Sequence, residues 1–156
     1  MRKLSFFLVV VLTANVTSPA LLGGIPSDKA VYRGGTVAAV ADGAEGAVTT
    51  TNEQYFEFDY RRGRYRIAYE RVNFLEFGQK AGRRLGLALA FGLPILFSKK
   101  RRHFLTINFL DEDGKQQAMV FELGKSIVRR TLVSIEARTG KRIEYQDDDA
   151  RRMGSN

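Results

Sequence analysis

The sequence contains no cysteine and only one histidine among its 156 residues, and both shortages limit its chemistry. Without thiols the chain cannot form disulfides, bind zinc through thiolates or attack a substrate with a cysteine nucleophile. A single histidine also excludes a metal site built from several imidazoles. We therefore expect no metal site and no cofactor.

The rest of the composition is that of a folded, basic protein. Hydrophobic residues make up 44% of the chain, with 11 Phe and 6 Tyr, and the formal net charge is +8. This content is too apolar and too aromatic for a disordered basic tail. The length is that of one domain with a core of its own.

The first twenty residues have the three parts of a secretory signal. Arg2 and Lys3 precede the apolar run Leu4–Ala14, and the small residues of Ser18–Ala20 suit a cleavage site after Ala20. The run is shorter than the roughly 20 apolar residues that span a bilayer. We expect an exported protein, periplasmic or extracellular, in which residues 1–20 are removed and residues 21–28 form a linker. An uncleaved membrane anchor and a buried helix are the alternatives.

The stretch Tyr55–Tyr69 predicts a β-hairpin. Apolar and polar residues alternate with period two on both sides of Arg61-Arg62-Gly63. A two-residue loop at Arg62-Gly63 pairs Tyr60 with Tyr65 and keeps both apolar faces on one side, with Gly63 supplying a positive φ.

Other segments also have β character. They are Ala30–Val40, Ala47–Thr51, Val72–Phe77, Leu105–Phe109 and Ala118–Leu123. The apolar phase breaks between Phe74 and Leu75, which predicts a bulge or bend. Glu112-Asp113-Gly114 predicts a three-residue hairpin loop with Gly114 left-handed, closed by Asp111 facing Lys115.

One later segment has helical spacing. Ser126 can cap it, apolar residues recur from Ile127 to Ile135, and Gly140 is placed to end it. We expect residues 146–156 to form a polar tail that frays beyond Tyr145.

Seven short strands followed by a helix predict a mainly β fold with one C-terminal α-helix. The simplest arrangement is a bent antiparallel sheet or a small barrel, with the helix plugging one end. In this order the chain resembles bacterial pleckstrin-homology-like (PH-like) domains of exported proteins over residues 29–145. The phrases that carry the resemblance are Tyr32–Gly35, Leu75–Gly78, His103–Phe109, Val120–Leu123 and Ala137–Lys141. The resemblance implies a binding or scaffolding module and carries over no ligand residue.

An apolar insertion, Leu85–Phe97, departs from a plain PH-like core. It contains no charged residue and is flanked by cations on both sides. It is too short to span a bilayer as a helix. Two interpretations remain: a connection that packs on the sheet and covers an open edge, or a loop that dips into an anionic membrane surface. The residues expected to contact lipid in the second interpretation are Lys80, Arg83, Arg84, Leu93, Leu96, Phe97, Lys99, Lys100, Arg101 and Arg102.

The hairpin cations suggest nucleic acid as another partner. They are Arg61, Arg62, Arg64 and Arg66, interleaved with tyrosines. The alternation places these tyrosines inward and the arginines outward, and an exported chain rarely meets nucleic acid. We therefore expect a solvated basic face and no nucleic-acid partner.

No arrangement of residues predicts catalysis, so no catalytic residue is assigned. His103 follows the cations Lys99–Arg102, which disfavour its protonation. Asp111–Asp113 lacks the remaining ligand spacing of a calcium loop. A hydrolase would need carboxylates to converge in a cleft. The candidates for such a pair are Glu57, Glu70, Glu76 and Glu122.

The expected function is therefore a non-enzymatic, exported binding or scaffolding module. Its partner is either an anionic membrane surface or a protein of the cell envelope. The alternatives are a structural subunit of an envelope complex and a hydrolase with carboxylates that the sequence does not reveal.

Overall fold

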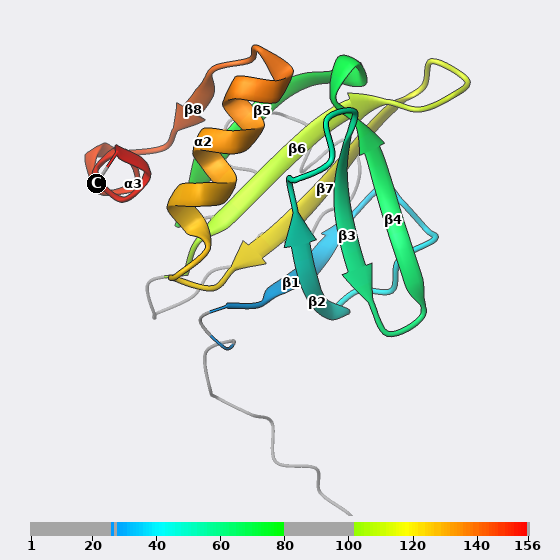
Figure 1. Cartoon of the computed structure of the whole chain (residues 1–156), viewed down its shortest axis with the longest axis horizontal. Coiled ribbons are helices and arrows are strands. Elements are labelled where there is room, and N and C mark those ends of the chain that lie inside the picture. The colour runs from blue at the N-terminus through cyan, green and yellow to red at the C-terminus, as the bar shows by residue number, and fades with distance from the viewer. Residues whose placement is uncertain (1–25, 27, 80–101, 156) are drawn as a thin grey trace, which may run out of the picture.

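The computed structural model describes residue 26, residues 28–79 and residues 102–155. These residues form one eight-stranded sheet in the order β4-β3-β2-β1-β7-β6-β5-β8, with helices packed beside it (Figure 1). The strands are β1 (Ala30–Gly35), β2 (Glu45–Thr49), β3 (Tyr55–Tyr60), β4 (Gly63–Ala68), β5 (Val72–Gly78), β6 (Phe104–Leu110), β7 (Gln116–Leu123) and β8 (Ile143–Tyr145). The helices are the 3-10 turn η1 (Tyr69–Arg71), α2 (Val128–Thr139) and α3 (Asp148–Ser155).

Two antiparallel meanders make up most of the sheet. β1 to β4 form one and β5 to β7 the other, and the antiparallel pairing of β1 with β7 joins them. The sheet does not close, because β4 and β8 stand at its two ends. The predicted mainly β fold with a C-terminal helix is confirmed, in its open-sheet form.

Aromatic side chains from both meanders meet in the core. The ring of Phe121 on β7 lies 5.8 Å from that of Tyr32, 5.5 Å from Phe56 and 5.1 Å from Phe58, measured between centroids. All four residues are fully buried. A single apolar cluster therefore holds the two meanders together.

Helix α2 closes one end of this core, as predicted. Leu132 and Ile135 on its inner side are buried. Its outer residue Ser134 donates from Oγ to the carbonyl oxygen of Thr50 at 3.5 Å, at the connection between β2 and β3. Gly140 ends the helix with a φ of 65°, a left-handed conformation that glycine adopts without strain. The helix begins one residue later than expected, with Ile127 rather than Ser126 at the N-cap position.

The β6–β7 hairpin has the predicted loop. The Asp111 N–H donates to the Lys115 carbonyl at 2.9 Å, and Gly114 is left-handed with a φ of 75°. β5 also has an irregularity, but it is a register shift between Val72 and Phe74 and does not lie between Phe74 and Leu75, where it was predicted.

The predicted register of the β3–β4 hairpin is wrong by two residues. Tyr60 pairs with Gly63 and Phe58 with Tyr65, so the loop is Arg61-Arg62 and not Arg62-Gly63. A shift of two residues leaves every side chain on the same face, so the apolar pattern could not distinguish the two registers. Gly63 has a φ of 150° and follows the loop directly.

The C-terminal residues are ordered into β8 and α3, where a fraying tail was expected. β8 pairs in parallel with β5, with Ile143 beside Leu75. In α3, the Asp147 carboxylate accepts a hydrogen bond from the Ala150 N–H at 2.8 Å, and the Ala150 side chain is buried. Asp148 and Asp149 in the first turn of α3 also complement the helix dipole, which favours the helix over a frayed tail.

Candidate functional site

Nine of the ten expected lipid contacts lie outside the described residues. They are Lys80, Arg83, Arg84, Leu93, Leu96, Phe97, Lys99, Lys100 and Arg101. The apolar segment Leu85–Phe97 also lies outside them. The structure therefore places only Arg102 among these residues.

Arg102 lies in an ion cluster at the start of β6. Its Nη1 is 3.0 Å from Oε2 of Glu122, and the guanidinium of Arg33 donates from Nε to the same oxygen at 2.7 Å. The Glu122 side chain is 4% exposed, against 30% for Arg102 and 25% for Arg33. Because a buried carboxylate needs a charged partner, Arg102 stabilises the fold as well as adding positive charge to this end of the sheet.

His103, the next residue, is held between aromatic and charged neighbours. Its ring stacks on Phe77 with 6.3 Å between centroids. Burial lowers the pKa of His103, and the positive charge of Lys125 lowers it further, while Glu122 opposes the shift. The expected direction is therefore confirmed, although burial is the main cause rather than neighbouring cations.

The strand registers bring several chain segments to one end of the sheet. Gly78 pairs with Phe104, Phe104 with Glu122, and Ala30 with Leu123. On the other meander, Gly46 pairs with both Ala30 and Tyr60. One row of strand ends consequently runs across the sheet. It contains the β3–β4 turn, the start of β1, the end of β7, the start of β6 and the end of β5.

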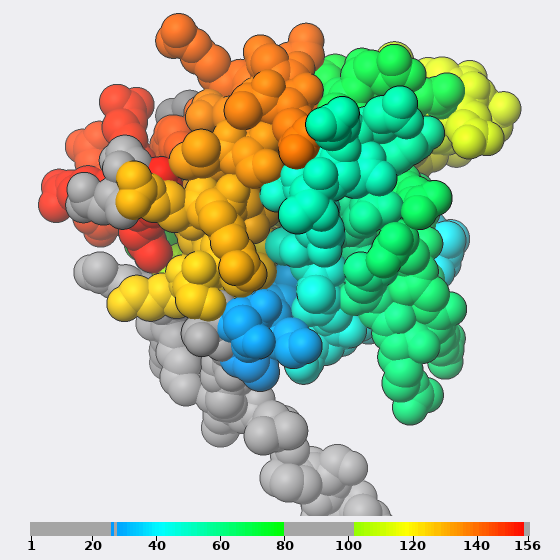
Figure 2. All heavy atoms as spheres, in the orientation of Figure 1, coloured from blue at the N-terminus to red at the C-terminus, as the bar shows by residue number. Residues whose placement is uncertain are grey.

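We call the cations along this row of strand ends the basic rim. They are Lys29, Arg61, Arg62, Arg102 and Lys125. Arg61, Arg62 and Lys125 are exposed, and Lys29 is partly so. Figure 2 shows the residues before β1, in blue, beside the yellow link between β7 and α2. Carboxylates also adjoin the rim in the chain: Asp28 precedes Lys29, and Asp59, whose side chain is 38% exposed, lies two residues before Arg61.

Two more cations follow the rim in the first turn of α2. Arg129 and Arg130 are exposed there, and this turn contains no acidic residue. Cations near a helix N-terminus oppose the helix dipole. Their position is therefore unfavourable for the helix itself and adds to the positive potential near Lys125.

The opposite ends of the strands are richer in carboxylates. These residues are Glu53, Glu70, Asp111, Glu112 and Asp113, with Arg71 and Lys115 among them. Asp111 closes the β6–β7 turn and accepts from Gln117 Nε2 at 2.7 Å, and this bond, with others from backbone N–H groups, lowers the pKa of its carboxyl. The molecule thus has a basic end and a more acidic end.

Both long apolar stretches of the sequence connect to the domain at the basic rim. Leu4–Ala14 precedes the chain that enters β1 at Ala30. Leu85–Phe97 lies between the end of β5 at Gly78 and the start of β6 at Phe104, and those two residues pair with each other. The described residues that flank the Leu85–Phe97 stretch, and the point where the chain enters β1, therefore lie at the same end of the strands as the basic rim.

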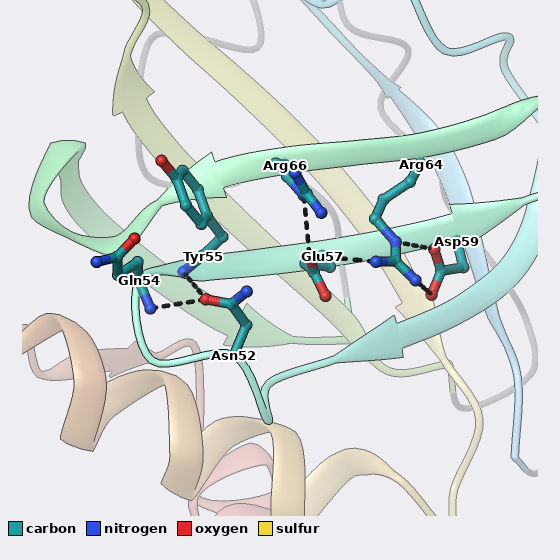
Figure 3. Close-up of polar contacts among 7 residues, drawn as sticks. All are labelled: Asn52, Gln54, Tyr55, Glu57, Asp59, Arg64 and Arg66. Carbon is teal, nitrogen blue, oxygen red and sulfur yellow. Dashed lines mark hydrogen bonds and ion pairs between the residues drawn. The ribbon is translucent and has the colours of Figure 1, made fainter.

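Two of the four arginines of the β3–β4 hairpin, Arg64 and Arg66, pair with carboxylates (Figure 3). Arg66 donates from Nε to Glu57 Oε1 at 2.9 Å, and Arg64 pairs with Asp59. The guanidinium of Arg66 also lies 5.8 Å from the centroid of the Tyr55 ring. Arg64 and Arg66 are therefore paired with carboxylates within the sheet, whereas Arg61 and Arg62 at the turn are exposed.

The buried carboxylates lie on separate strands. Glu57 is on β3, Glu76 on β5 and Glu122 on β7. Glu76 accepts from Gln146 Nε2 at 2.8 Å, and the other two pair with arginines. Among the described residues, no group of three or more His, Asp or Glu side chains is placed to hold a metal ion.

The basic rim could not be predicted as a unit, because its members are scattered along the sequence. Arg61 and Lys29, for example, come together only through the ladder that runs across β3, β2 and β1. Within the described ranges, no helix has both the length and the apolar character needed to cross a membrane. No protein-family model matches the chain, and no curated protein or solved structure matches it either.

Proposed function

We propose that the protein is a non-enzymatic binding module of the cell envelope that contacts an anionic membrane surface with its basic rim. The observation that carries this proposal is the position of the basic rim, at the strand ends where the chain enters β1 and where it leaves β5 and returns to β6 around the Leu85–Phe97 stretch. Apolar segments next to cations are typical of proteins that bind at the membrane interface. The resemblance to PH-like domains supports a binding module over an enzyme.

The rim and the apolar insertion contribute differently to this contact. Each basic residue near an anionic surface contributes about 1 kcal/mol, and salt screens that attraction over about 8 Å at physiological ionic strength. Leu93, Leu96 and Phe97 in the insertion add a contribution that salt does not weaken, at roughly 25 cal/mol per Å² removed from water. We expect binding that is strong at low salt and reduced, but not abolished, at high salt.

We also propose export, with cleavage after Ala20. Intact-mass measurement of the protein from the envelope fraction tests cleavage. A species that still begins at Met1 contradicts it.

Co-sedimentation with vesicles tests the membrane contact. The full chain is mixed with vesicles of phosphatidylglycerol and phosphatidylcholine, or of phosphatidylcholine alone, across a salt series. Replacing Lys29, Arg61, Arg62 and Lys125 by Gln is expected to weaken binding to the anionic vesicles at least about tenfold. Arg102 is left in place because it pairs with Glu122.

The control variant loses the same charge from positions outside the rim. It carries Gln at Arg71, Lys115, Lys141 and Arg142. It is expected to bind within about twofold of the wild type, since these residues lie away from the basic rim that contacts the membrane. Equal losses in both variants would show that only net charge matters. A wild-type chain that ignores anionic vesicles would contradict the proposal.

A further inference from the structure

Strand β4 has an open edge. It stands at the end of the sheet, and among the described residues only β3 pairs with it. The Tyr69 N–H donates to the Gln54 carbonyl at 2.9 Å, just beyond the last pair of the ladder. Because bonded and non-bonded pairs alternate in an antiparallel ladder, Arg64, Arg66 and Ala68 direct their backbone N–H and C=O groups outward.

The charged side chains of β4 pair with carboxylates of β3, and Arg66 also lines the groove beside the edge. Charged residues on an edge strand usually block the addition of another strand. Here Arg64 and Arg66 turn back across β3 to reach Asp59 and Glu57 (Figure 3). Among the described residues, the outward backbone groups of β4 consequently have no strand partner.

A groove runs along the open edge, between β4 and the end of β6. Its volume is about 480 Å³, and its lining includes Tyr65, Ile67, Phe109 and Leu110. Ile67 and Phe109 are buried, whereas Leu110 is 40% exposed. The edge therefore has an apolar wall next to it that can take side chains from an added strand.

The groove is negative where it meets the β6–β7 turn. Asp111 and Glu112 line it there. Burial raises the pKa of the Tyr65 hydroxyl, and the negative charges of Asp111 and Glu112 raise it further. Both carboxylates therefore contribute negative potential inside the groove. A cationic side chain is favoured at this end.

We propose that this groove binds an extended peptide segment, which adds to β4 as a further strand. Its backbone pairs with Arg64, Arg66 and Ala68, and alternate apolar side chains enter the groove beside Ile67 and Leu110. A lysine or arginine of the peptide lies near Asp111 and Glu112. This site is separate from the basic rim and goes beyond the proposed membrane contact.

Selection from a display library of short random linear peptides tests the proposal on the full chain. We expect enriched peptides with alternating apolar residues and a flanking Lys or Arg. On binding, they should slow hydrogen exchange at the Arg64, Arg66 and Ala68 amides, which are otherwise open to solvent. A selection without enrichment, or protection confined to other strands, would overturn the proposal.

A proline substitution tests the edge hydrogen bonds. Arg66→Pro removes an outward N–H and leaves the β3–β4 ladder intact, since edge strands tolerate proline at such positions. Arg66→Ala is the matched control, because it loses the same ion pair with Glu57 and keeps the N–H. We expect Arg66→Pro to weaken a selected peptide about tenfold, and Arg66→Ala to change its affinity by less than about threefold.

Two further measurements keep the test independent of folding. A selected peptide that is N-methylated at alternate residues should lose binding to the unaltered protein, since it cannot donate to the edge. Glu112→Gln should weaken Lys-bearing peptides more than Asp113→Asn, whose carboxylate is in the same turn but does not line the groove. Equal binding of the methylated and unmodified peptides would overturn strand addition, whatever the vesicle experiments show.

Discussion

Asn108 lies in the middle of β6 with 1% of its surface exposed, and neither its amide oxygen nor its amide nitrogen has a hydrogen-bond partner among the described residues. Its neighbour Thr106 on the same face of the strand is also buried. In the sequence, Leu105, Ile107 and Phe109 alternate with Thr106 and Asn108, and the structure buries both faces of this strand. The sequence pattern could not show this, because burial of a second face depends on what packs there.

We expect Asn108→Leu to stabilise the protein. A buried, unsatisfied amide costs about 1–3 kcal/mol of desolvation, which leucine avoids at similar volume. The control is Asn73→Leu, because Asn73 is exposed and donates from Nδ2 to Gln116 Oε1 at 2.7 Å. Chemical denaturation should give a higher free energy of unfolding for the first variant only. A loss of stability in Asn108→Leu would show that the amide has a partner in solution.

The lowered pKa of His103 makes stability depend on pH. In the unfolded chain histidine titrates near 6.5, whereas burial keeps the folded imidazole neutral to lower pH. The unfolded state therefore binds more protons below about pH 6.5, and stability falls as the pH drops through this range. The His103→Phe variant keeps the stacking on Phe77 but does not titrate. Its melting temperature should fall less between pH 7.5 and 5.5 than that of the wild type, and equal falls would contradict the assignment.

At the level of the elements, local sequence signals correctly predicted the features that they determine directly, namely one turn and one helix end. The β6–β7 loop follows from the placement of Gly114, and the end of α2 from Gly140. The β3–β4 register depends on which two residues form the turn, and the apolar pattern does not contain that information. The pairing of Arg102 with Glu122 was also not predictable, since it requires the β6–β7 register.

The two carboxylates of β3 should differ in their effect on stability. Glu57 is 6% exposed and pairs with Arg66, whereas Asp59 is 38% exposed and pairs with Arg64. We expect Glu57→Gln to cost about 1 kcal/mol and Asp59→Asn less than about 0.5 kcal/mol, because solvent screens the exposed pair. Denaturation at two salt concentrations measures both. Equal costs would mean that burial does not strengthen the Glu57 pair.

At the scale of the whole molecule, the two meanders depend on each other. They share one β1–β7 pairing, the cluster around Phe121, and the inner side of α2. A sheet of this kind is expected to unfold as one unit, since neither meander buries its aromatic residues alone. Local loosening of one half would expose the core of the other.

The substitution Ile135→Ala tests this dependence. It should cost about 2–5 kcal/mol, because it leaves a cavity below α2. The exposed Val133→Ala on the same helix should change stability by less than about 0.5 kcal/mol. Native-state hydrogen exchange should show equal losses of protection in β3 and β6 for Ile135→Ala. Faster exchange in only one meander would contradict a single cooperative unit.

The two edge strands of the sheet, β4 and β8, differ in a way that limits how copies of the chain can assemble. The edge strand β8 is only three residues long. Helix α3 packs beside it, with Gly154 against the Tyr145 ring. Short, covered strands resist edge pairing, so in the described part of the chain growth of the sheet is confined to β4. Each domain can then accept one added strand. If two copies joined β4 to β4, both open edges would be used, and assembly would stop at a symmetric dimer rather than continue into a fibre.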